Sequence, residues 1–290
     1  MSPERLLELL QTLIPWAVGA AIAATAYRLV PRLAPIVRLL PGRPRVRLPP
    51  DRVPEAWREV VGRNVPLAAR LSGPDRERLL RLMQVFVREV PMEGVGLEIT
   101  GEIRVTVAAL ACLALLDLEY PRYPTLRRIL VYPGVFQPRR VPSLGVGEIY
   151  HEPGATLGEA WTGGIVVLAW ESCLVSSLDP DDGRNVVLHE FAHVLDGENG
   201  AMDGVPVLER TGALRAWRAA LRSAYDREVA AVLAGDGEPP VHPYGATSRA
   251  EFFAVVTEEF FERPVSLRQK LPEFYAELCR FYRRDPAGTA

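Results

Sequence analysis

Cysteine is scarce in this chain and lysine is almost absent. Cys112, Cys173 and Cys279 stand far apart among 290 residues, and no two of them form a CxxC pair. An odd number of cysteines at such spacing excludes a disulfide framework or a cysteine zinc knuckle as the basis of the fold. We therefore expect buried structural thiols. Lys270 is the single lysine, so arginine carries nearly all of the positive charge.

The chain also lacks an excess of charge of either sign. It has 34 basic and 36 acidic residues, which leaves a formal net charge of −2. Proteins that bind nucleic acid usually present a strong basic excess on one face, so we expect no nucleic-acid partner. The hydrophobic fraction of 48% is ordinary for a globular fold, and the length allows one large domain with an appendage.

Residues 1–30 least resemble a globular domain. From Leu9 to Tyr27, nineteen residues carry no charge, which is about the length of a bilayer-spanning helix. Six arginines follow between positions 28 and 47, and the positive-inside rule keeps that side in the cytoplasm. We predict an N-terminal hydrophobic helix that anchors a single-pass protein in the cell inner membrane, with the main domain cytoplasmic.

Two other interpretations of this segment stay open. Ala24, Thr25 and Ala26 resemble a signal-peptidase site, as in a cleaved secretory signal. Alternatively, the segment is an amphipathic or core helix of a soluble cytoplasmic protein. Residues 31–54 hold seven prolines among arginines, which predicts an extended linker. We expect the globular domain to cover residues 55–290.

The globular region mixes helical and strand patterns. Apolar spacing predicts helices that begin at Ser72 and that cover Arg104–Leu118, Asn185–Leu195 and Ala250–Phe261, with short strands at Ile129–Tyr132 and Ile165–Trp170. This pattern predicts an α+β fold that is mostly helical and has a small sheet. The strand at Ile165–Trp170 is either an edge that pairs with an extended substrate or an interior strand.

The residues that indicate chemistry begin at His189-Glu-Phe-Ala-His193, a His-Glu-x-x-His motif. Residues four apart lie on one face of a helix, so both imidazoles can bind one ion. Glu190 is rotated by about 100° and can reach a water instead. Zinc suits two imidazoles, an oxygen ligand and one open position. The alternative is a pair of buried histidines satisfied by hydrogen bonds, but the apolar helical context favours a metal site.

A third ligand must come from elsewhere, because no histidine follows His193 at the spacing that the all-histidine motif requires. The apolar helix at Ala250–Phe261 carries Glu251 and Glu258, seven residues apart and so on nearly one face. A buried glutamate needs a metal or a hydrogen-bonding partner. We predict Glu251 as the third ligand and Glu258 as a partner that orients an imidazole. We also expect Asp196, at the end of the motif string, to lie behind the ligands and support the site.

These motifs occur with others in an order that resembles the Mlc titration factor A family of zinc-dependent peptidases. The resemblance covers about residues 60–286 and is carried by 130–136 (LVYPGVF), 164–170 (GIVVLAW), 189–196 (HEFAHVLD), Asn199-Gly200, 204–206 (GVP), 244–247 (YGAT), 250–255 (AEFFAV) and Glu258. It implies a zincin-like metallopeptidase domain with a gluzincin-type site. It also implies one Zn²⁺ per chain, bound by His189, His193 and Glu251, with Glu190 as the general base.

The arrangement is also similar to the peptidase domain of the lethal-factor toxins. There a tyrosine stands seven residues before the glutamate ligand, as Tyr244 does before Glu251. The resemblance implies that the Tyr244 hydroxyl stabilises the oxyanion; otherwise Tyr244 is an aromatic residue that packs before a helix.

We therefore predict a zinc peptidase that hydrolyses peptide or protein substrates. Because family members are named for binding a transcriptional repressor, the alternative is a regulatory module that binds a protein partner and has little peptidase activity.

Overall fold

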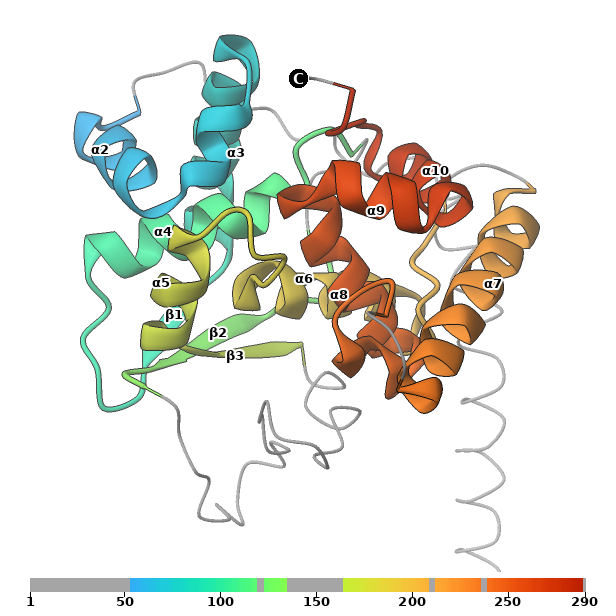
Figure 1. Cartoon of the computed structure of the whole chain (residues 1–290). Helices are drawn as coiled ribbons and strands as arrows, with labels where there is room; N and C mark the ends of the chain where they lie inside the picture. The colour runs from blue at the N-terminus through green and yellow to red at the C-terminus, as the bar shows by residue number, and fades with distance from the viewer. Residues whose placement is uncertain (1–52, 119–122, 135–163, 209–211, 236–238, 289–290) are drawn as a thin grey trace, which may run out of the picture. The chain divides into compact units, whose positions relative to one another are not determined.

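The structure is a computed structural model that describes residues 53–118, 123–134, 164–208, 212–235 and 239–288 (Figure 1). Its strands are β1 (Met92–Gly94), β2 (Arg128–Tyr132) and β3 (Ile165–Ala169). Its α-helices are α2 (Glu55–Asn64), α3 (Gly73–Glu89), α4 (Gly101–Leu113), α5 (Trp170–Leu178), α6 (Val186–Asp196), α7 (Ala213–Ala234), α8 (Arg249–Glu262), α9 (Pro264–Lys270) and α10 (Pro272–Tyr282). The described part is thus mostly helical with a small sheet, which confirms the predicted α+β class.

The three strands form one parallel sheet in the order β1-β2-β3. Alternate residues of β2 and β3 are buried, and the strands lie below α4, α5 and α6 in the view of Figure 1. Within the described ranges, β3 pairs only with β2, so β3 forms one edge of this sheet. The strand is one residue shorter than predicted because Trp170 begins α5.

Polar side chains at helix starts define where several helices begin. The side chain of Asn185 accepts a hydrogen bond from the Leu188 amide at the start of α6, and Ser248 accepts one from the Glu251 amide at the start of α8. Ser72 caps α3 in the same way. Such caps satisfy amides that have no partner within the helix. The capping residues therefore determine where the turns that carry the site residues begin.

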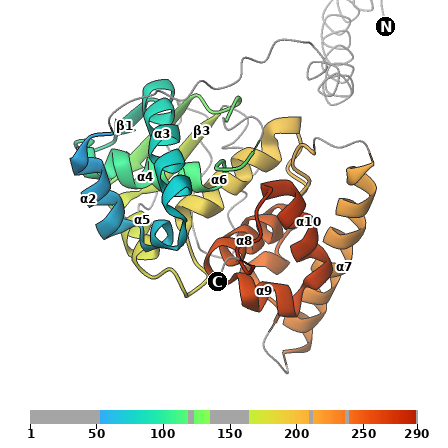
Figure 2. The same ribbon diagram turned by 90° about the horizontal axis from the view of Figure 1, so that it is seen from above.

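Helices α6 and α8 pass through the interior. Every residue of α6 from Val187 to Asp196 is buried, as is every residue of α8 from Ala250 to Glu262. The polar residues of both helices therefore face protein, not water. On the other side of α8 lies α7 (Figures 1 and 2). The ring centroid of Trp217 on α7 lies 5.8 Å from that of Phe253 on α8.

In the part of the chain that the structure describes, no helix is both long and apolar enough to cross a bilayer. Helix α7 has 22 residues but carries several charges, whereas the apolar α4 has 13 residues and spans only about 20 Å. The predicted single-pass inner-membrane location, with the membrane as a partner, is contradicted by this finding. Residues 1–52, with the predicted hydrophobic helix and most of the predicted linker, lie outside the described residues. The domain boundaries stay a prediction.

Candidate metal centre

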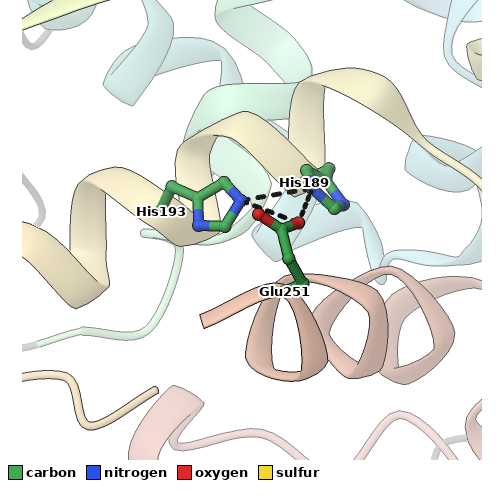
Figure 3. Close-up of side chains that lie close together, drawn as sticks. All are labelled: His189, His193 and Glu251. Atoms are coloured by element: carbon green, nitrogen blue, oxygen red, sulfur yellow. Dashed lines mark hydrogen bonds and ion pairs between the residues drawn. The ribbon is translucent and has the colours of Figure 1, made fainter. Parts of the chain in front are cut away.

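The centre is built where α6 faces α8. His189 and His193 lie one turn apart on α6 and are 2% and 0% exposed. Glu251 lies in the first turn of α8 and points toward both imidazoles (Figure 3). The predicted ligands come from segments about sixty residues apart in sequence, and the packing of α6 on α8 brings them together.

The donor atoms are spaced as a small metal ion requires. Glu251 Oε2 lies 3.0 Å from His189 Nε2 and 3.4 Å from His193 Nε2, and the two Nε2 atoms are 3.2 Å apart. Zinc bonds of 2.0–2.2 Å in tetrahedral geometry separate two ligand atoms by about 3.3–3.6 Å. The three residues form a group whose ligand atoms all lie within 4.8 Å of one another. The residues present therefore fit a metal ion of this kind.

The electrostatics of the group favour a cation between the side chains. Burial by itself raises the pKa of Glu251, but hydrogen bonds from His189 and His193 outweigh it and lower the pKa to about 2. Burial by itself lowers the pKa of His189, but Glu258 and Glu251 outweigh it and raise the pKa well above its ordinary value. The site therefore stabilises positive charge, as a metal-binding site must.

Glu258 connects the metal centre to the start of α6. Its Oε1 lies 2.7 Å from His189 Nδ1, and its Oε2 accepts a hydrogen bond of 2.5 Å from the backbone amide of Asn185. A carboxylate at Nδ1 keeps a ring proton there and would leave the Nε2 lone pair available to a metal ion. Glu258 thus contacts an imidazole, and its role in orienting that ring stays a prediction.

Glu190 lies next to His189 on α6 and is only 1% exposed. Its Oε2 is buried and has no hydrogen-bond partner within the described residues. Burial raises the pKa of Glu190, while His189 and His193 act in the opposite direction. A buried carboxylate with a raised pKa is suited to accept a proton.

Residues 42–283 match the model of the family described as glucose-regulated metallo-peptidase M90. This chain belongs to the M90 family. It is 36% identical over 236 residues to uncharacterized protein slr2042 of Synechocystis sp., covering 81% of this chain and 86% of that protein.

Relatives named Mlc titration factor A confirm the predicted resemblance. The protein of Klebsiella pneumoniae is 30% identical over 233 residues, covering 79% of this chain and 86% of that protein. The protein of Cronobacter sakazakii is 30% identical over 241 residues, covering 80% and 87%. The chain is thus a metallopeptidase-family protein with a His-His-Glu group compatible with a metal ion.

The M90 chain places Tyr244 beside this group. Tyr244 is partly buried, and its ring centroid lies 6.0 Å from that of His189. Burial raises the pKa of the Tyr244 phenol well above its ordinary value, and the carboxylates of Glu251 and Glu190 raise it further. The phenol therefore stays protonated over the physiological range and can donate a hydrogen bond.

Asp196 is hydrogen-bonded to the backbone, and its supporting role at the centre stays a prediction. It is fully buried at the end of α6, but its Oδ2 accepts a hydrogen bond of 2.9 Å from the Gly204 amide and none from an imidazole. Burial raises the pKa of Asp196 to about 7, although the Gly204 amide opposes that shift. Asp196 thus connects the end of α6 to the chain at Gly204.

Asn185 and Glu262 lie near the centre, but the sequence analysis did not predict either of them as part of it. The side-chain amide of Asn185 donates a hydrogen bond of 3.1 Å to Glu262 Oε1, while the Asn185 backbone amide binds Glu258. Glu262 lies four residues after Glu258 and so on the same face of α8. The sequence did contain a signal for these two residues. Asn185 stands at the start of a predicted helix, and Glu258 and Glu262 are spaced by four on an apolar helix.

Proposed function

We propose that this M90 chain is a zinc-dependent peptidase that hydrolyses peptide or protein substrates. The observation that carries the proposal is the buried His-His-Glu group, whose ligand atoms lie within 4.8 Å of one another beside the buried carboxylate of Glu190. Two imidazoles and one carboxylate are a donor set that zinc prefers, so His189, His193 and Glu251 would hold one Zn²⁺ per chain. Bound zinc would lower the pKa of a water molecule and polarise the scissile carbonyl.

The residues around the group supply the proton transfers. Glu190 accepts the proton of the attacking water and delivers it to the leaving amine. Its burial supports this role, because a carboxylate with a raised pKa is a stronger base and accepts a proton from water more readily than an ordinary carboxylate does. Tyr244 donates its hydroxyl hydrogen to the oxyanion that develops on the carbonyl oxygen. The edge strand β3 pairs with the extended substrate backbone.

A second function is favoured by the relatives. Mlc titration factor A is, by its name, a protein that titrates Mlc. We carry over to this chain only the coarser idea, a regulatory module that binds a protein partner with little or no peptidase activity. The two functions differ in their dependence on Glu190, since a binding module does not require a general base.

The test compares metal content with hydrolysis. Elemental analysis after dialysis is expected to find about one zinc per wild-type chain, and Glu251→Ala is expected to lose it. Glu190→Gln is expected to keep the zinc but to lose cleavage of a peptide library. Glu277→Gln, a change at a buried carboxylate on α10, serves as the control and is expected to alter neither property.

Two outcomes would contradict the assignment. If Glu251→Ala held zinc as well as the wild type and Glu258→Ala did not, the third ligand would be wrong. If zinc-loaded wild type and Glu190→Gln both failed to cleave the library, while both captured the same protein, the regulatory function would replace the peptidase.

A further inference from the structure

Helix α7 carries a buried charge on its apolar face. Its buried residues are Trp217, Ala220, Leu221, Ala224 and Glu228, which follow helical spacing. Glu228 is the only charged member of this stripe and is 0% exposed. A buried carboxylate is costly unless it is hydrogen-bonded, so an acidic residue at a position suited to an apolar one needs an explanation.

The hydrogen bond that Glu228 makes explains why a carboxylate is buried here. Its Oε2 accepts a hydrogen bond of 3.1 Å from the backbone amide of Val241. One turn earlier on α7, the Tyr225 hydroxyl donates a hydrogen bond of 3.0 Å to the carbonyl oxygen of Ala246. The two side chains thus hold both ends of residues 241–246, and Tyr244 lies between the two attachment points.

The segment between these points is short and tightly folded. The Gly245 amide donates to the His242 carbonyl at 2.9 Å, and the Thr247 amide donates to the Tyr244 carbonyl at 3.1 Å. A Cβ atom at Gly245 would lie 3.4 Å from the ring of Phe252 on α8, so the segment has little free space on that side. A shift of the backbone at Val241 or at Ala246 would therefore also move Tyr244.

We propose that Glu228 and Tyr225 are positioning residues that hold the Tyr244 hydroxyl at the place where it contacts the substrate carbonyl. The proposal rests on the proposed role of Tyr244 in peptide hydrolysis. Neither residue touches the substrate; each acts through the backbone of residues 241–246. Catalysis is sensitive to such placement, because an error of about 1 Å can cost on the order of 100-fold in rate.

The test removes one hydroxyl. Tyr225→Phe is expected to lower kcat about tenfold on a fluorogenic peptide that the wild type cleaves, with KM and zinc content unchanged. Backbone hydrogen exchange in residues 241–247 of both the zinc-free and zinc-loaded chains should become faster, while exchange in α6 stays the same. The matched control is Tyr275→Phe on α10, which removes a hydroxyl bonded to Asp285 and should leave kcat unchanged.

Glu228 provides a second pair of variants. Glu228→Gln keeps an oxygen that can accept from the Val241 amide and is expected to retain turnover within about threefold of wild type. Glu228→Leu removes the acceptor and is expected to lose at least tenfold in kcat. If Glu228→Leu does not fold, the comparison of Tyr225→Phe with Tyr275→Phe still tests the proposal.

A double-mutant cycle decides whether the effect passes through Tyr244. In the Tyr244→Phe background, Tyr225→Phe should lower kcat no further, because the hydroxyl that it positions is gone. A full tenfold loss in that background, or no loss in the wild-type background, would overturn the inference while leaving the peptidase proposal intact. Unchanged turnover in Tyr244→Phe alone would instead remove Tyr244 from the proposed mechanism and the inference with it.

Discussion

Replacing Glu258 with glutamine tests how α8 controls the metal centre. The carboxylate of Glu258 accepts at both oxygens, with His189 Nδ1 at 2.7 Å and the Asn185 amide at 2.5 Å. Glutamine has the same shape but only one oxygen. If that oxygen faces Asn185, the new NH₂ group faces His189 and turns Nδ1 into an acceptor. The ring proton then moves to Nε2, the atom that lies 3.0 Å from Glu251 and that would bind the metal in the proposed site.

The opposite orientation is also unfavourable. With its oxygen toward His189, the glutamine directs its NH₂ group at the Asn185 amide, so two donors face each other. This second arrangement leaves a buried donor unsatisfied, at a cost of about 1–3 kcal/mol, whereas the first places a proton on Nε2 of His189. Loss of a residue that orients a metal ligand typically lowers metal affinity 10- to 100-fold. We therefore expect the zinc Kd of Glu258→Gln to rise 10- to 100-fold, or about 1.4–2.7 kcal/mol.

Competition with a chromogenic chelator measures this affinity directly. Glu277→Gln is the matched control, because Glu277 and Glu258 are each 7% exposed but Glu277 lies on α10 and pairs with Arg280. Circular dichroism would show that each variant is folded. A Glu258→Gln protein with native circular dichroism and a zinc Kd within threefold of wild type would refute the argument that Glu258 sets the His189 tautomer.

Two further variants test the surroundings of the centre. Gly204→Ala should destabilise by at least about 2 kcal/mol more than Gly200→Ala. Both glycines have positive φ (75° and 85°), but a Cβ atom at Gly204 would lie 2.5 Å from the Arg249 carbonyl oxygen, whereas nothing lies within 4 Å at Gly200. Equal losses in urea unfolding would contradict this clash. Mainly through burial, the pKa of Glu262 rises from an ordinary 4.5 to about 8. Between these values the folded chain binds more protons than the unfolded chain, so the stability that Glu262 contributes falls as the pH rises. Glu262→Gln should therefore gain stability relative to wild type at pH 8 compared with pH 5, and a pH-independent difference in urea unfolding would argue against it.

Local patterns were enough to predict much of the fold and to select the three residues that the structure brings together as the His-His-Glu group. The apolar spacing that surrounds His189 and His193 is a property of one helix, and α6 has nearly the predicted bounds. Glu251 could be identified because a charged residue in the apolar helix α8 needs a partner. The mostly helical α+β class followed from the same periodicities.

Contacts between distant segments depended on the tertiary structure. Asn185 pairs with Glu262 across 77 positions. The spacing of the glutamates on α8 marks a shared face of the helix but does not identify Asn185 as the partner. The motif that ends at Asp196 does not indicate a hydrogen-bond partner for its carboxylate, and the fold brings the Gly204 amide to it. Helical periodicity specifies which face of a helix is buried. Which backbone or side chain meets that face is set by how the helices pack, and a buried polar group binds whichever partner the packing provides.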